Sequence, residues 1–426
     1  MKINTQKMTF QLTAKYSLIH CCYWSIMCSS LNFASVFLLS KHFSNSQIGL
    51  ILALANIFAV VPQPAVASFA DHTSKISIQS LSALLAFFAG LLAAGRILLS
   101  NCFAALGVLL VLELTVLFTL QPLLNSLGMQ LINQGVPFNF GFARGMGSMA
   151  FAVFSVILGS LVQSLGTDFL SVFSTVLSVL LGISILMLTK RQKLPKGAEQ
   201  HLPSAKADPV PAPDLNQNSS GLIAFISQNR RFFLLMVAVS LTFCSHTMIN
   251  NFPIQITENV GGTEREMGIA IGLAAAIELP AMSIFAFLMK KFRCSSILKF
   301  SLLFFMVKAA VTLFATNVWT WYAAQLIQCG AYALFIPASV YYVNTIIQQK
   351  DHAKGQAFVT TAITVGGVVA SLFGGWLLDG PGVGGMLLAG LIFSALGLAI
   401  GLFATQKTDQ KGEADLDSLP AEPPTN

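Results

Sequence analysis

The stretch KRQKLPKGAEQHLPSAKADPVPAPDLNQNSS, residues 190–220, is the longest polar segment of this chain and divides it into two parts. It is rich in Pro, Lys and other polar residues, a composition typical of a flexible linker. Six apolar stretches precede it and six follow it. Each has roughly 20 residues, the length of helix that crosses a bilayer core of about 30 Å. The sequence therefore predicts an all-α membrane protein with twelve transmembrane helices in two six-helix bundles.

The apolar stretches set the boundaries of the expected helices. They cover residues 16–40, 47–70, 77–99, 103–125, 141–164 and 168–189, then 230–256, 265–289, 296–316, 319–347, 355–379 and 384–404. The last residues are acidic and contain few apolar side chains, so we expect them to be disordered. The predicted organisation is an N-terminal half at 1–189, a cytoplasmic linker at 190–229, a C-terminal half at 230–404 and a cytoplasmic tail at 405–426.

Composition excludes an ordinary soluble protein. Of the 426 residues, 55% are hydrophobic and 10% are charged, whereas a soluble domain has about 25% charged residues. The net charge of +7 would suggest nucleic acid in a soluble protein, but here the basic residues fall mostly in alternate loops, as in the cytoplasmic loops of inserted proteins. These residues are Lys2, Lys7, Lys15, Lys75, Lys190, Arg191, Lys193, Lys196, Lys206, Arg230, Arg231, Lys290, Lys291, Arg293, Lys350, Lys354, Lys407 and Lys411. We therefore expect a multi-pass cell-membrane protein with both termini in the cytoplasm and no nucleic-acid partner.

No catalytic pattern is visible in the sequence. The seven cysteines show no metal-ligand spacing, and no nucleophile constellation or phosphate-binding loop is present. We therefore predict neither enzymatic activity nor a cofactor. Two halves around a site at the bilayer midplane are instead the layout of alternating-access transporters. Gly366, Gly367, Gly374 and Gly375 indicate close helix approach in the eleventh span.

The charged residues inside the expected spans are the main guide to function, because an ionised group in hydrocarbon must face a cavity or a partner. Glu278 lies near the middle of span eight and Lys308 at a similar depth in span nine. The two are predicted to pair, with Glu278 carrying or gating a proton; a purely structural pair is the alternative. Arg144, at the start of span five, either extends to the headgroups or grips hydroxyls or a carboxylate with its planar fork.

Two further charges lie in the outer half of the first six spans. Glu113, in span four, is interpreted either as a second proton site or as a partner of Arg96. Arg96, near the outer end of span three, is more readily explained as an interfacial anchor.

Uncharged polar residues occur in several spans and can either line a cavity or bond neighbouring helices. They are His20, Tyr23, Trp24, Asn32, Gln121, Asn125, His246, Asn250, Asn251, Gln325 and Gln328.

Three short motifs resemble a known group of transporters. They are FGFARGMGS (140–148), the acidic residue in GLAAAIELPAM (272–282) and the basic residue in FFMVKAAV (304–311). With the twelve-span layout, they make the chain similar to the major facilitator superfamily, and within it to the oligosaccharide:proton symporter group of which lactose permease is a member. The resemblance implies that Arg144 binds sugar and that Glu278 and Lys308 belong to the coupling machinery.

The chain departs from that group at several positions. Asn125 stands near the place of an acidic sugar ligand, and Phe151 replaces the tryptophan that stacks on the sugar. Gln328 and Ala331 fall near the place of a His and Glu pair. In the superfamily's loop motif Asp71 is kept; the resemblance implies a gating role for it.

The sequence as a whole indicates a secondary active transporter, predicted to move a sugar or oligosaccharide together with protons by alternating access and to act as a monomer. The residues expected to bind substrate are Arg144, Asn125, Phe151, His246, Asn250 and Gln328, and those expected to couple protons are Glu278, Lys308 and Glu113. Two alternatives remain open. One is a major facilitator transporter or exporter of another small solute, such as an organic anion or a drug, and the other is a membrane receptor that transports nothing.

Overall fold

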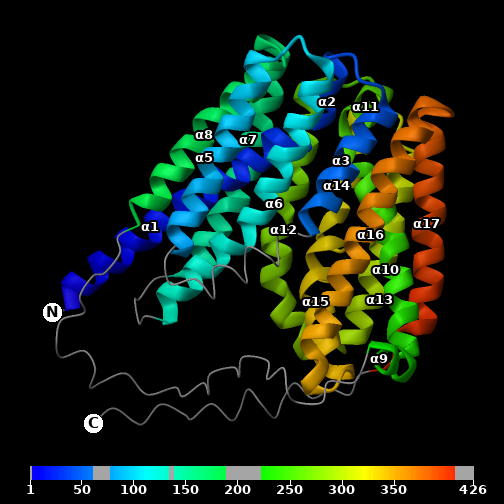
Figure 1. The fold of residues 1–426 in the computed structure, drawn as a ribbon. Coiled ribbons are helices and arrows are strands. Elements are labelled where there is room, and N and C mark those ends of the chain that lie inside the picture. Colours follow the sequence, from blue (N-terminus) through cyan, green and yellow to red (C-terminus); the bar gives the residue numbers. More distant parts are fainter. Residues whose placement is uncertain (1, 61–76, 134–138, 189–221, 408–426) are drawn as a thin grey trace.

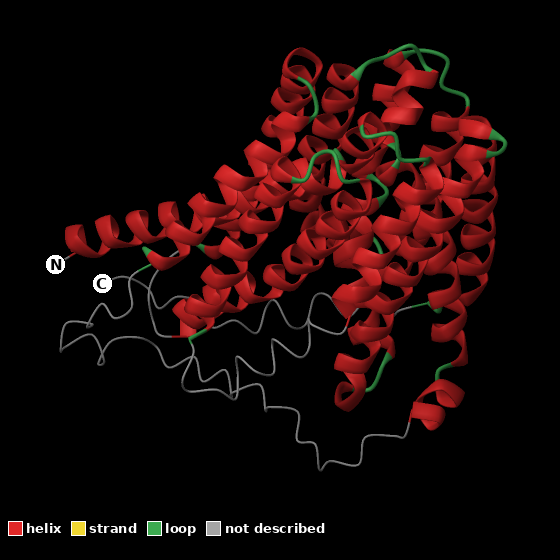
Figure 2. Cartoon of the chain, turned by 45° about the horizontal axis from the view of Figure 1, so that its top comes forward, coloured by secondary structure: helices red, strands yellow, loops and turns green. Residues whose placement is uncertain are grey.

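The computed structural model describes residues 2–60, 77–133, 139–188 and 222–407, which form helices joined by short loops with no strand among them (Figures 1 and 2). The N-terminal bundle contains α1 (Lys2–Met27), the π-helical turn η1 (Cys28–Asn32), α2 (Ala34–Ser40), α3 (Asn45–Val60), α5 (Ile78–Leu98), α6 (Phe103–Asn133), α7 (Phe140–Leu165) and α8 (Asp168–Leu186). The C-terminal bundle contains α9 (Leu222–Gln228), α10 (Arg230–Asn251), α11 (Pro253–Asn259), α12 (Glu264–Lys291), α13 (Cys294–Leu313), α14 (Val318–Leu326), the 3₁₀ turns η3 (Ile327–Cys329) and η4 (Gln349–Asp351), α15 (Tyr332–Ile346), α16 (His352–Asp379) and α17 (Gly382–Ala404).

Many of these helices are suited to a bilayer. Within the described ranges, nine helices are long and apolar enough to cross a membrane, or ten if the bent pair α1 and α2 counts as one span. Helix α3 is apolar and has 16 residues, and the rest of the expected span 47–70 lies outside the described residues. The protein is thus a multi-pass membrane protein, and the full number of twelve spans stays a prediction.

Short polar side chains set where several helices begin, because the first backbone N–H groups of a helix lack partners within it. The side-chain oxygen Oδ1 of Asn139 accepts from the backbone N–H of Phe142 at 2.9 Å at the start of α7. Asn317 does the same for Thr320 at 3.0 Å in α14. Thr263 and Glu266 form a reciprocal capping box at the start of α12.

Three of the expected continuous spans are broken, and one of them, 230–256, divides at Phe252 between α10 and α11. The first, 16–40, bends by 45° between α1 and α2 at the turn η1, and π-turns are a recognised cause of such kinks. The tenth, 319–347, is interrupted after η3, where a Cβ on Gly330 would lie 2.0 Å from the Phe304 ring. The chain passes so close to the Phe304 ring of α13 there that a side chain at position 330 would require this ring to move. The sequence pattern showed the spans but not these breaks.

The two bundles meet at one end of the molecule and diverge toward the other, where α1 begins and α17 ends (Figure 1). Two helix pairs join them, α7 with α12 and α3 with α16, and α2 also contacts α11. We call the end with α2 and α11 the closed end.

Glycines allow the backbones to touch at the closed end. A Cβ on Gly49 of α3 would lie 2.0 Å from the Ser371 carbonyl oxygen of α16, and one on Gly375 would lie 2.3 Å from the Asn45 oxygen. On the second helix pair, a Cβ on Gly268 would lie 2.3 Å from the Ser155 oxygen. The expectation of close helix approach in span eleven is confirmed at Gly375. No bulkier residue fits at these positions unless the bundles separate.

A polar contact closes the same end. The Asp379 carboxylate at the end of α16 accepts hydrogen bonds from the backbone N–H and the side-chain amide of Asn45, both at 3.0 Å, and from the backbone N–H of Ser46 at 2.8 Å. Gln255 of α11 donates to the Asn45 side-chain oxygen at 2.8 Å. A carboxylate of the C-terminal bundle therefore caps the first turn of α3 in the N-terminal bundle, where the helix dipole favours negative charge.

Candidate functional site

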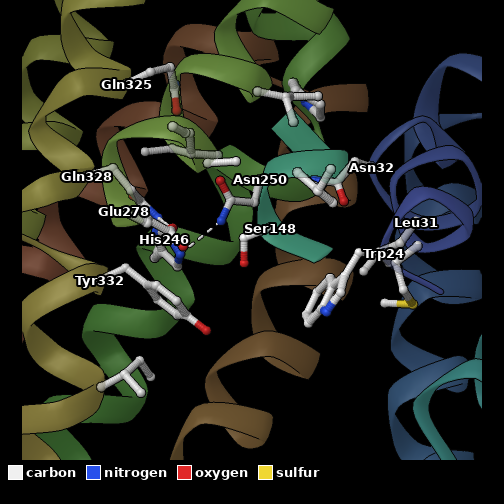
Figure 3. A pocket seen from close by; sticks show the side chains of 18 of the residues that line it. Trp24, Leu31, Asn32, Ser148, His246, Asn250, Glu278, Gln325, Gln328 and Tyr332 are labelled. Atoms are coloured by element: carbon white, nitrogen blue, oxygen red, sulfur yellow. Dashed lines mark hydrogen bonds between the residues drawn. The ribbon is translucent and has the colours of Figure 1, made fainter. Parts of the chain in front are cut away.

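A cavity of about 360 Å³ lies between the bundles, within the size range of small-molecule sites. Both bundles contribute to its wall (Figure 3). The lining residues are Trp24, Met27, Leu31, Asn32, Arg144, Ser148, Phe151, His246, Ile249, Asn250, Pro253, Ile271, Ala274, Ala275, Glu278, Trp321, Gln325, Gln328, Tyr332 and Ile336. The cavity therefore combines aromatic surface with a few polar and charged groups.

The N-terminal wall is an aromatic corner beside a cation. The rings of Trp24 and Phe151 meet edge to face, with centroids 6.3 Å apart and planes at 80°. Gly147 leaves room for the Trp24 indole, because a Cβ on Gly147 would lie 2.4 Å from it. Arg144, which lies on α7 with Gly147 and Phe151, is half-buried and also lines the cavity.

The C-terminal wall carries an imidazole held from two sides. His246 Nε2 lies 2.9 Å from the side-chain amide nitrogen of Asn250, one turn further along α10. The imidazole ring stacks on Tyr332 with centroids 5.5 Å apart and planes at 19°. Because the amide nitrogen can only donate, the bond makes Nε2 the acceptor and places the imidazole proton on Nδ1. Figure 3 shows Tyr332 and His246 on the side of the cavity opposite Trp24.

Glu278 and Lys308 are connected through a third residue. The buried ammonium of Lys308 donates to the side-chain oxygen of Gln328 at 2.7 Å. The amide nitrogen of Gln328 donates in turn to Glu278 Oε1 at 2.9 Å. The predicted direct pair is not among the ion pairs of the described residues; Gln328 instead bridges the two side chains, with its amide dipole aligned between them. Glu278 and Gln328 face the cavity, whereas Lys308 lies behind them.

Glu113 lies away from this cavity, inside the N-terminal bundle. Its carboxylate forms a fully buried ion pair with Arg96, at 2.9 Å between Oε2 and a guanidinium nitrogen. Of the two interpretations from the sequence, the structure contains the partnership with Arg96. Arg96 is 2% exposed, which excludes the interpretation of this residue as an interfacial anchor.

The remaining polar residues divide between cavity and helix packing. Asn32 and Gln325 line the cavity, whereas Asn125 and Gln121 do not. Among the rest, Tyr23 donates to the Leu117 carbonyl at 3.0 Å, Asn251 donates to Ser371 at 2.8 Å, and His20 is buried outside the cavity wall. Asp71 lies outside the described residues.

Three polar or aromatic residues of the wall were not predicted: Ser148, Trp321 and Tyr332. Ser148 follows Arg144 by four residues and therefore shares its helix face, so the signal was available. Tyr332 also follows Gln328 by four residues. The helix is broken between η3 and α15, however, so this spacing does not imply a shared helix face.

Two helix bundles around a polar and aromatic cavity, joined by close contacts at one end, have the layout of a membrane transporter. The model of the MFS_1 like family matches residues 13–386, and the chain belongs to that family of major facilitator transporters.

Known proteins support the same assignment. The chain is 25% identical over 375 residues to a maltose permease of Geobacillus stearothermophilus, covering 87% of this chain and 88% of that one. It is 23% identical over 346 residues to the transporter YwbF of Bacillus subtilis (strain 168), covering 79% and 77%. The crystal structure of the nucleoside transporter NupG has the same fold, with a TM-score of 0.74 at 14% identity, and the match covers 92% of this chain and 98% of that one.

Proposed function

We propose that the protein is a sugar or oligosaccharide:proton symporter that works by alternating access. The bridged group Lys308–Gln328–Glu278 in the cavity wall is the observation that carries this proposal. It places a titratable carboxylate in the wall of the cavity, where protonation and substrate binding can influence each other. The similarity to a maltose permease favours a sugar over other solutes.

The cavity has the groups that a sugar needs. Trp24 and Phe151 offer apolar surface to the C–H face of a pyranose ring. Arg144, Asn250 and Gln325 offer fixed donors and acceptors to hydroxyl groups. In this proposal the substrate lies between the aromatic corner and the His246–Tyr332 stack, in contact with both bundles at once.

Glu278 is proposed as the proton carrier. While ionised, it accepts from Gln328 and so stays linked to Lys308. Protonation removes the negative charge, so the attraction that aligns the bridge is lost and Gln328 is free to turn toward substrate. Return of the empty carrier then requires the proton to leave, because a lone buried ammonium without its counter-charge is costly. Sugar and proton thereby move together.

The orientation follows the positive-inside rule. We propose that the closed end faces the outside, that the termini and the linker at 190–229 are cytoplasmic, and that the halves 1–189 and 230–404 rock against each other as rigid units. The contacts at Gly49, Gly268 and Asp379 would then form the outer gate. The protein would act as a monomer in the cell membrane, with no cofactor.

An organic anion is the second candidate substrate. Arg144 lines the cavity, and within the described part of the chain it has no ion-pair partner. A guanidinium in that position suits a carboxylate as well as a diol. Competition experiments distinguish the two candidates: only members of the true substrate class, sugars or organic anions, should compete with the transported solute.

The test is the pH outside de-energised cells after addition of single mono-, di- and trisaccharides, maltose among them. Symport predicts transient alkalinisation with at least one sugar. Glu278→Gln, which keeps the shape but not the titratable group, is expected to abolish the signal while sugar still exchanges across the membrane. No pH change with any sugar, in cells shown to contain the protein in the membrane, would contradict the proposal, and competition by organic anions would then support the second candidate.

A further inference from the structure

The π-helical turn η1 has two faces with different surroundings. Leu31 and Asn32, at its end, line the cavity. Ser29 and Ser30, just before them, are fully buried on the side toward α6 and α8. A π-turn is a strained insertion in a helix and is retained where the surroundings stabilise it.

A hydrogen-bond network fixes that buried face. Ser30 Oγ donates to Glu113 Oε1 at 2.6 Å. The hydroxyls of Ser29 and Ser30 also lie 2.7 Å and 2.9 Å from that of Ser174 on α8. Glu113 is also paired with Arg96, so Ser30 bonds to an oxygen of an ion pair, and such charge-assisted bonds are the stronger kind.

Arg96 contacts the other side of the same break. Its guanidinium lies over the ring of Phe37 on α2, 5.1 Å from the centroid. The ion pair thus contacts the first span both before and after the 45° bend, through Ser30 and through Phe37. A buried ion pair gives little net stability compared with apolar packing, so its position against the bend indicates a role beyond holding the bundle together.

We propose that Arg96 and Glu113 are positioning residues that fix η1 on the side away from the cavity. They thereby set the position of Leu31, Asn32 and the preceding Trp24 in the cavity wall. Neither charge touches the cavity. Their effect on substrate passes through Ser30 and the bent backbone. The claim about the turn stands by itself, whereas its consequence for affinity rests on the proposed sugar transport.

The first test uses Ser30→Ala, which removes the link and leaves the ion pair in place. Ser171→Ala is the matched control, because Ser171 is also buried and its hydroxyl has no hydrogen-bond partner among the described residues. Hydrogen–deuterium exchange of peptides covering residues 25–36 is compared in the purified full-length proteins. Loss of a bond to a charged acceptor predicts about tenfold faster exchange in Ser30→Ala and no change in the control. Equal exchange in both variants would overturn the proposal.

The second test measures maltose uptake. Ser30→Ala is expected to raise KM about tenfold with kcat nearly unchanged, and Ser30→Thr, which keeps the hydroxyl, is expected to restore KM. A rise in exchange without a rise in KM would refute the positioning role in transport. Absence of maltose uptake by the unmodified protein would count against the proposed substrate only, because the exchange experiment decides the role of the turn without any substrate. Glu113→Gln, where it folds, is expected to match Ser30→Ala in exchange.

Discussion

Replacing Gly49 with alanine should open the closed end. The added Cβ would lie 2.0 Å from the Ser371 carbonyl oxygen and 3.0 Å from its carbon, and both are backbone atoms that cannot rotate away. Relief needs about 1.5 to 2 Å of separation between α3 and α16 to reach ordinary van der Waals distance. Overpacking of this kind costs about 1–3 kcal/mol. Because the cost falls only on the state in which the bundles touch, the balance of states should shift about 5- to 150-fold away from it.

The assay is the labelling rate of a thiol introduced by Asn32→Cys in the cavity wall, with a membrane-impermeant maleimide applied to each face of the membrane in turn. Exposed Cys102 is first replaced with serine. Gly49→Ala is expected to make labelling from the closed-end face about 5- to 150-fold faster. Gly384→Ala, where a Cβ meets open space, is the control and should change nothing. Since alanine favours helix over glycine, a loss of helix cannot explain an effect. Equal rates in the Gly49 variant and its parent would refute the packing argument.

Three further predictions follow from other contacts. Asp379→Asn should raise the same labelling severalfold but less than the glycine variant, because the carboxylate is exposed to water and its bonds are weakened by solvent. Gly147→Ala should raise the KM for uptake about tenfold by displacing Trp24, whereas Gly145→Ala, with no atom near its Cβ, should leave the KM unchanged. Lys308→Met should abolish proton-driven accumulation and preserve sugar exchange between the two sides, because only the proton step uses the bridged charges; loss of both would show that Lys308 is needed for folding or binding.

Much of the architecture could be predicted because the bilayer imposes a simple rule. A helix must be apolar for about 20 residues to cross it, so the stretches on either side of the linker were visible in the sequence. The same rule identified Glu278 and Lys308, since a charge in a span needs a cavity or a partner. Both belong to one bridged group in the structure.

The rotation of each helix could not be predicted. Tyr23 and Trp24 are neighbours in the sequence, but one bonds the α6 backbone and the other lines the cavity. The helices are apolar nearly all round, because lipid and protein interior are both apolar, so periodicity does not reveal which side faces the cavity. This explains why Asn125 was expected in the site and lies outside its wall.

The break in the first span could not be predicted for a different reason. Residues 28–32 read CSSLN, with no proline or glycine to signal a bend. The π-turn depends on partners from other helices, among them Glu113 and Ser174. Such tertiary contacts have no local sequence pattern.

The central claim is that sugar and proton cross together, and uptake into proteoliposomes containing only this protein tests it most directly. Radiolabelled maltose is supplied outside, with the outside made acidic relative to the lumen. The account predicts accumulation above the external concentration that collapses when a protonophore is added and is absent with Glu278→Gln. Uptake that stops at the external concentration whether or not the pH gradient is present would show a carrier without proton coupling and would contradict the account.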